Sequence, residues 1–224
     1  MHTGKGSITE LILEEGYLYA RLACPENLIP APGQYLLASG GSDSPLPVSI
    51  FYTDSTPGGF ITTADGSYWK PGDVLHLRGP RGRGFSVPAS ARKIALIAFD
   101  NAPSRLRGLI RPALAQNVSV VLVSSSVGDG LPDDVEVQPL SAMNEVMRWA
   151  DYVALDVSRE HLPQLRERLL ERNQLAAVKE AQVLIRTDMP CGGIAECGVC
   201  AITTRSTWKL ACKDGPVFDL SELI

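Results

Sequence analysis

The sequence has no apolar run of the roughly 18–20 residues that a membrane-spanning helix needs, so we expect no membrane span. It has no excess of basic residues either, because 21 Lys and Arg stand against 25 Asp and Glu, a formal net charge of −4. This balance makes nucleic acid an unsuitable main partner. The first ten residues, MHTGKGSITE, lack the apolar core of a secretion signal, so we expect a cytoplasmic protein.

Histidine is scarce. His2, His76 and His161 are the three in the chain, and they are far apart in sequence. They form no recognisable ligand cluster, and we find no constellation of nucleophile, acid and base elsewhere. We therefore predict no catalytic residues, and we expect a subunit of a complex rather than a stand-alone enzyme.

The chain does contain five cysteines, and four of them lie near the C-terminus. Cys191, Cys197, Cys200 and Cys212 follow the pattern C-x5-C-x2-C-x11-C. A [2Fe–2S] cluster takes two thiolates on each iron, and plant-type proteins supply three from one loop and the fourth from further along. Glycines between the first three let backbone N–H groups approach the sulfides. We predict that these four cysteines hold a [2Fe–2S] cluster.

Two other uses of the cysteines stay open. A structural zinc site also takes four thiolates, but such sites usually pair two CxxC-type knuckles and this segment has one. Disulfides need an oxidising compartment, which the expected location does not provide. The fifth cysteine, Cys24, lies in a strand-like stretch and is predicted to be a small buried apolar residue.

Residues 1–90 have the pattern of a small β-barrel. Short alternating stretches are broken by turn sequences such as PENLIPAPG, STPGG and KPGD, and helical periodicity is nearly absent. Six strands would be enough to form the barrel.

Residues 91–186 change to apolar strands that alternate with helices, which indicates a parallel sheet covered on both faces. Ser158 is the predicted N-cap of the last helix. The remaining residues, 187–224, contain the cysteines and form a C-terminal module. The strands are predicted at 93–99, 117–126, 135–140, 152–157 and 181–187, and the helices at 103–116, 141–150 and 158–175.

The order of barrel, α/β domain and cysteine loop resembles one group of the ferredoxin–NADP reductase superfamily. The segment ACKDGPVFDLSEL (211–223) is similar to the C-terminus of the electron-transfer subunit of class 1B dihydroorotate dehydrogenase, an enzyme of pyrimidine biosynthesis. The turn GPRGRGF (79–85), the MPCG opening and the CGVC pair add to this resemblance.

The resemblance implies a relay subunit. Electrons would leave a flavin in a catalytic dehydrogenase partner, cross the [2Fe–2S] cluster, reach FAD in the barrel and pass to NAD. Two alternatives stay open. One is a scaffold or regulatory subunit with a structural cluster, and the other is a complete FAD- and NAD-dependent reductase whose motifs have drifted.

The NAD motifs of the family are missing here. The glycine-rich turn after the first α/β strand is replaced by AFDNAPSRL (98–106), and Asp100 adds a negative charge where a pyrophosphate would lie. The family's C-G-P turn corresponds to ALDVSRE (154–160), which contains none of those residues. We therefore expect no NAD binding, and an acceptor such as a ferredoxin or another flavoprotein.

The flavin motif R-P-x-S is changed less. Pro47 and Ser49 are kept around Val48, but Leu46 replaces the arginine and cannot make its bidentate contact with phosphate. FAD binding through Pro47, Val48 and Ser49 stays open, because backbone contacts can also hold a phosphate.

Five polar or aromatic residues near the motifs have uncertain roles. Arg81 and Arg83 are interpreted as a solvated turn, with contact to an anionic cofactor or acidic partner as the alternative. Trp208 and Lys209 could shield the cluster, pack on a partner or pack in the core. Glu196, inside the cysteine loop, would lower the reduction potential if it is exposed.

Overall fold

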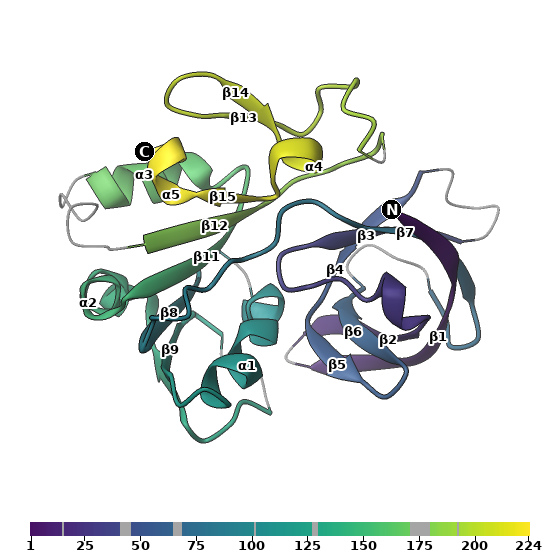
Figure 1. Cartoon of the computed structure of the whole chain (residues 1–224), viewed down its shortest axis with the longest axis horizontal. Helices are drawn as coiled ribbons and strands as arrows, with labels where there is room; N and C mark the ends of the chain where they lie inside the picture. Colours follow the sequence, from purple (N-terminus) through teal and green to yellow (C-terminus); the bar gives the residue numbers. More distant parts are fainter. Residues whose placement is uncertain are drawn as a thin grey trace.

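The computed structural model describes residues 1–14, 16–40, 46–64, 69–100, 102–126, 130–170, 180–191 and 193–224. Two sheets lie side by side, and the C-terminal module lies across one end of both (Figure 1). Among the described residues, no helix is long and apolar enough to cross a membrane.

The N-terminal half is a curled antiparallel sheet, in agreement with the predicted barrel. It has seven strands in the order β4-β3-β7-β1-β2-β6-β5, one more than expected. The extra strand arises because the turn at Pro57 and Gly58 folds a short hairpin from β5 and β6. The strands are β1 (His2–Glu14), β2 (Tyr17–Ala23), β3 (Tyr35–Ser39), β4 (Val48–Phe51), β5 (Asp54–Thr56), β6 (Gly59–Thr63) and β7 (Val74–Arg81).

The second half contains the predicted parallel sheet, in the order β10-β9-β8-β11-β12 with antiparallel β15 at the edge. One face packs on α1, and the other packs on α2 and α3. Every residue of β11 is buried, as expected for a strand covered on both sides. The elements are β8 (Lys93–Ala98), α1 (Ile110–Leu114), β9 (Ser119–Val123), β10 (Val135–Gln138), α2 (Met143–Trp149), β11 (Tyr152–Ser158), α3 (Leu162–Leu170), β12 (Glu180–Arg186) and β15 (Val217–Asp219).

The helix predicted over 103–116 is wrong in its first half. Two 3-10 turns, Pro103–Arg105 and Arg107–Leu109, precede α1. Pro112 has no N–H to bond the carbonyl of Gly108, so an α-helix cannot extend back through that turn.

The prediction that Ser158 is the N-cap residue of the last helix is wrong. Ser158 is the last residue of β11, four positions before α3 begins. Its hydroxyl still accepts a hydrogen bond from the backbone N–H of His161 at 3.3 Å, so it closes the turn between strand and helix. Residues 171–175 of the predicted helix lie outside the described residues.

The C-terminal module is a small hairpin followed by short elements. Leu220 and Leu223 pack in the core of the α/β sheet, so the end of the module completes that sheet. The predicted boundaries at residues 90 and 186 stay predictions. The elements are β13 (Ala201–Thr203), β14 (Trp208–Leu210), α4 (Ala211–Asp214) and α5 (Leu220–Leu223), with β15 between α4 and α5.

Candidate metal centre and adjoining cleft

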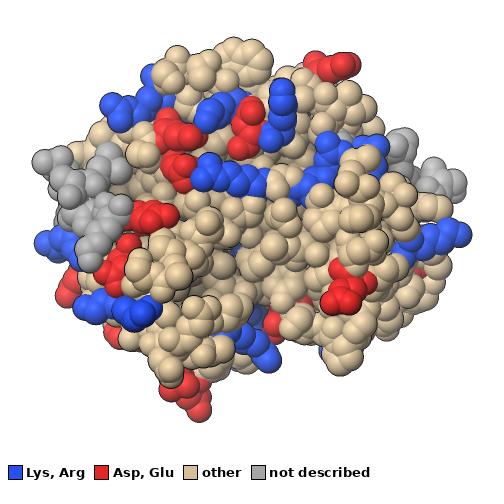
Figure 2. All heavy atoms as spheres, viewed as in Figure 1, with Lys and Arg blue, Asp and Glu red and all other residues tan. Residues whose placement is uncertain are grey.

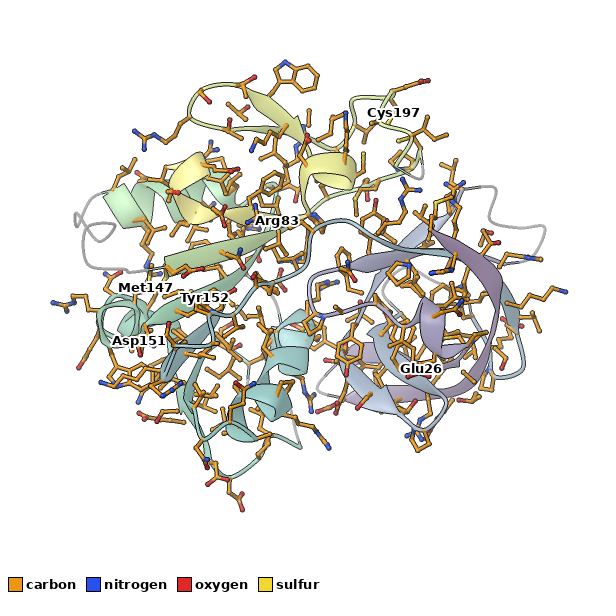
Figure 3. All side chains as sticks on the ribbon, in the orientation of Figure 1. Glu26, Arg83, Met147, Asp151, Tyr152 and Cys197 are labelled. Atoms are coloured by element: carbon orange, nitrogen blue, oxygen red, sulfur yellow. The ribbon has the colours of Figure 1, made fainter. Side chains whose placement is uncertain are left out.

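The cysteine loop (residues 191–200) follows β12 and lies beside the end of the barrel. Figure 3 shows Cys197 on this loop, on the side of the module above the barrel. Cys212 lies in α4, directly after β14. The hairpin of β13 and β14 therefore brings the fourth cysteine back to the other three.

The four thiols lie in a row of neighbours: Cys197, Cys191, Cys212 and Cys200. Cys191 lies beside Cys197, and Cys212 lies beside both Cys200 and Cys191. The inner pair is buried, with Cys200 1% and Cys212 3% exposed, whereas Cys191 is half-buried and Cys197 is exposed. The structure thus brings all four predicted ligands together. Their assignment as ligands stays a prediction.

A [2Fe–2S] cluster and a single zinc ion make different demands on the four cysteines, and the type of centre stays a prediction. Within the described residues, no group of three or more His, Cys, Asp or Glu side chains is arranged to hold a single metal ion. Zinc draws its four ligands around one point, whereas a [2Fe–2S] cluster takes two thiolates at each of two irons.

Backbone N–H groups point at the sulfur of Cys191. Burial raises its pKa, but hydrogen bonds from the N–H groups of Ala195, Gly193 and Ile194, together with the Cys197 thiol, lower that pKa to about 6. Gly193 has a φ of 76° and Ala195 one of 68°, a left-handed backbone that turns successive N–H groups toward one point. The loop is therefore shaped to hold an anionic sulfur.

A cleft of about 820 Å³ lies between the barrel and the carboxyl edge of the parallel sheet. Pro47, Val48 and Ser49, the predicted FAD residues, line it from β4 and the turn before it. Phe51 and Met189 supply apolar wall, and Leu46, 59% exposed, lies where the family has its arginine. The role of these residues in FAD binding stays a prediction.

A group of charges that sequence reasoning missed lies beside the cleft, and two of its members, Arg105 and Arg186, line the cleft. We call this group the sheet-edge network: Asp100, Arg105, Asp156, His161 and Arg186. Arg186 pairs with both aspartates, at 2.8 Å from Nε to Asp156 Oδ1. His161 Nδ1 lies 2.8 Å from Asp100 Oδ2, and Arg105 Nη1 lies 3.9 Å from Asp156 Oδ2.

Asp100 joins the two places where the NAD motifs are lost. Its carboxylate follows β8 and accepts a hydrogen bond from the backbone N–H of Ser158 at 3.1 Å, at the end of β11. Burial raises its pKa, but the Ser158 hydrogen bonds and the Arg186 charge outweigh burial and hold the pKa below its ordinary value. The carboxylate is therefore charged, at the edge where a dinucleotide phosphate binds in folds of this type.

A charge inside an apolar strand was the signal that could have revealed this network. Asp156 interrupts the run YVALDV and is fully buried, and burial raises its pKa despite the nearby Arg186. A buried carboxylate is almost always paired, so it predicts a cationic partner at the same sheet level. That partner, Arg186, comes from the neighbouring strand.

Arg81 and Arg83 make contacts that the interpretation as a solvated turn did not include, although Arg83 is exposed. Arg83 donates to both carboxylate oxygens of Asp219 at 3.0 Å, and Arg81 Nη2 donates to the carbonyl of Gly193 at 2.9 Å. Figure 3 shows Arg83 where the chain passes from barrel to sheet. Both arginines tie the barrel's last strand to the C-terminal module.

Core packing is excluded for Trp208, which is 65% exposed, whereas Lys209 pairs with Glu222 at 2.7 Å. Glu196 is exposed, and Cys24 is half-buried rather than buried. On the face shown in Figure 2, basic and acidic side chains are interspersed over the C-terminal module, and among the described residues neither sign forms a broad patch there.

Comparison with known proteins agrees with this architecture. Residues 187–224 match the family described as the iron–sulfur cluster binding domain of dihydroorotate dehydrogenase B. The chain is 27% identical to the electron transfer subunit of dihydroorotate dehydrogenase B (NAD(+)) from Clostridium acetobutylicum, over 86% of each protein. It is 23% identical to the gamma subunit of sulfhydrogenase 1 from Pyrococcus furiosus, over 86% of this chain and 80% of that one. The resemblance found in the sequence is confirmed.

Solved structures share the fold. An NADH-dependent reduced ferredoxin–NADP oxidoreductase superposes with a TM-score of 0.77 at 17% identity, over 98% of this chain and 89% of that one. A ferredoxin reductase of carbazole 1,9a-dioxygenase gives a TM-score of 0.62 at 17% identity, over 83% of this chain and 69% of that one. The ferredoxin-reductase-like fold with an iron–sulfur module is therefore confirmed.

Proposed function

We propose that this chain is an iron–sulfur electron-transfer subunit, which relays electrons between a flavin in a catalytic partner and a separate acceptor. The observation that carries the proposal is the gathering of all four cysteines around a loop whose N–H groups point at the sulfur of Cys191. The proposal is supported by the similarity of the chain to the electron transfer subunit of dihydroorotate dehydrogenase B and to the gamma subunit of sulfhydrogenase 1.

The proposed cofactor is a [2Fe–2S] cluster, with the outer pair of cysteines on one iron and the inner pair on the other. It would supply one-electron transfer. The chain holds the thiolates, excludes water from Cys200 and Cys212, and leaves Cys197 at the surface where a partner can approach.

FAD is the proposed second cofactor, in the cleft lined by Pro47, Val48 and Ser49. Its volume of about 820 Å³ lies within the range of cofactor pockets, roughly 300–1,000 Å³. Leu46→Arg restores the guanidinium of the family motif, and a good bidentate phosphate contact strengthens binding by about 1.4 kcal/mol, or tenfold. FAD affinity measured by fluorescence quenching should rise in this variant. Unchanged affinity would contradict placement of FAD beside β4.

The proposed partner is a cytoplasmic, flavin-containing dehydrogenase. Dihydroorotate dehydrogenase is the first candidate, because the segment Lys213–Phe218 resembles its electron-transfer subunit. The proposed acceptor is not NAD. The sheet-edge network supports this, because Asp100 already takes the Ser158 N–H and the Arg186 guanidinium at that edge.

The first experiment is a visible spectrum of anaerobically purified protein, followed by iron, sulfide, zinc and flavin analysis on the same sample. We expect two irons, two sulfides and no zinc per chain. One zinc without sulfide would overturn the electron-transfer proposal. Two irons without flavin would leave the relay in place but move the second redox centre to the partner.

The acceptor is tested in a complex reconstituted with the dehydrogenase partner. With dihydroorotate as donor, we expect reduction of a ferredoxin or flavoprotein and no reduction of NAD. Rapid NAD reduction would contradict this part of the proposal.

A further inference from the structure

Arg81 reaches from the barrel into the cysteine loop. It is the last residue of β7, and its Nη2 donates to the carbonyl of Gly193 at 2.9 Å. Its guanidinium also lies against the Cα of Gly193, because a Cβ built there would be 2.5 Å from Nη2 and 2.7 Å from Nε. The loop residue that directs an N–H at Cys191 is therefore the one that Arg81 covers.

Tyr35, the neighbour of Arg81 in the barrel, makes a second contact with the C-terminal module. It is paired with Arg81 across β3 and β7 and is fully buried. Its hydroxyl donates to the carbonyl of Cys212 at 3.1 Å and lies within hydrogen-bonding reach of Arg81. One pair of barrel residues thus contacts the loop of the outer cysteines and the backbone of an inner cysteine.

Tyr35 is also connected to the cleft, because its ring lies beside the ring of Phe51. Its ring centroid lies 6.0 Å from that of Phe51, and Phe51 lines the cleft. Tyr35 and Phe51 therefore form a path of two buried rings from the backbone of Cys212 to the cleft. This contact fixes the module relative to the cleft.

The charge of Arg81 has a direct electrostatic consequence. Reduction adds one electron to a centre that is already anionic, and a nearby cation stabilises the more negative state. Glu196, in the same loop, is exposed to water, where its opposing effect is screened, whereas Arg81 is partly buried.

Resting on the proposed cluster, we propose that Arg81, held in place by Tyr35, positions the two cysteine pairs and raises the reduction potential of the cluster. Arg81 is a positioning residue: it contacts Gly193 and Tyr35, and its guanidinium would act on the cluster from there. Nothing in the cysteine spacing reveals this role.

The test is an EPR-monitored redox titration of the full chain with its cluster, with iron measured on every sample. Arg81→Gln keeps a hydrogen-bond donor but removes the charge, and its potential should shift to more negative values. Arg81→Lys keeps the charge, and its potential should stay near that of the unmodified chain. Tyr35→Phe keeps the ring and should shift the potential in the same direction as Arg81→Gln, but less.

Arg83→Gln is the matched control, because Arg83 lies two residues away and pairs with Asp219 instead. Its potential should not move. An unchanged potential in Arg81→Gln at full iron content, or equal shifts in Arg81→Gln and Arg81→Lys, would overturn the inference. If Arg81→Gln assembles no cluster, an unchanged potential in Tyr35→Phe would overturn it. An unmodified chain without iron would overturn the proposed function itself.

Discussion

The cysteine loop and the carboxyl edge of the parallel sheet adjoin one cleft, yet they use their polar groups in opposite ways. In the loop, the N–H groups of Gly193, Ile194 and Ala195 point at a cysteine sulfur. At the sheet edge, the N–H of Ser158 and the guanidinium of Arg186 are taken by the chain's own Asp100. The difference teaches that a cofactor site needs donors that the fold leaves available to a ligand. The loop has them, and the sheet edge has given them to an internal carboxylate.

The largest effect is expected on removal of one of the two buried cysteines of the C-terminal module. Cys200→Ser and Cys212→Ser should each abolish iron binding, because a buried hydroxyl cannot replace a thiolate at iron. Cys24→Ser is the control, since Cys24 lies in the barrel and should leave iron content unchanged. Iron and sulfide analysis measures both. Full iron in either inner variant would contradict the assignment of ligands.

Asp100→Asn tests the sheet edge. It leaves Arg186 with one carboxylate in place of two, and removal of one partner from a buried ion pair costs roughly 3 kcal/mol. Denaturant unfolding should show this loss. Asp54→Asn is the control, because the partner of Asp54, Arg111, is 74% exposed, and such a pair is worth less than about 1 kcal/mol. Equal losses in the two variants would contradict the role of the network.

The same carboxylate predicts a pH dependence. The pKa of Asp100 is lowered in the folded chain, so its stabilisation is present above the unfolded value of about 3.9 and is lost as pH falls through the lower folded value. The free energy of unfolding of the unmodified chain should therefore fall more steeply below about pH 4 than that of Asp100→Asn. Parallel curves would contradict this.

Two glycines of the cysteine loop sharpen the comparison further. Gly193 and Gly198 both have positive φ, so alanine at either should cost about 1 kcal/mol of stability. A Cβ at Gly193 meets the Arg81 guanidinium, whereas nothing lies within 4 Å of one at Gly198. Only Gly193→Ala should therefore displace Arg81 and lower the cluster potential. Equal potentials in the two variants would contradict this.

The smallest effect is expected at the surface. One nitrogen of Arg83, Nη2, contacts both carboxylate oxygens of Asp219, and the pair is about two-fifths exposed on each side, so Arg83→Gln should cost about 0.5–1 kcal/mol. Thermal unfolding would show a shift of about 2–4 °C or less. A larger loss of stability would mean that the contact between the segment after β7 and the C-terminal module depends on this pair more than its exposure indicates.

Local patterns were sufficient for much of the fold. Apolar runs located β8, β9, β11 and β12, since a strand buried on both faces needs apolar residues throughout. They failed over 103–116, where Pro112 lacks the N–H that an α-helix requires. They also did not predict the contacts of Tyr35 and Arg81 with the C-terminal module, because the sequence around a barrel tyrosine or arginine does not indicate a partner far along the chain.

The sequence alone predicted that the cysteines form one metal-type centre, because thiolate spacing is set by covalent chain length and by the glycines that admit backbone to sulfur. It also determined that the dinucleotide motifs are absent. Only the tertiary structure decided that Asp100, after β8, meets Arg186, at the end of β12, across the intervening β11. It also decided that Arg81 contacts Gly193 while its neighbour Tyr35 contacts the backbone of Cys212. Those contacts join residues 86 to 177 positions apart, and pairings of that range depend on sheet order and register.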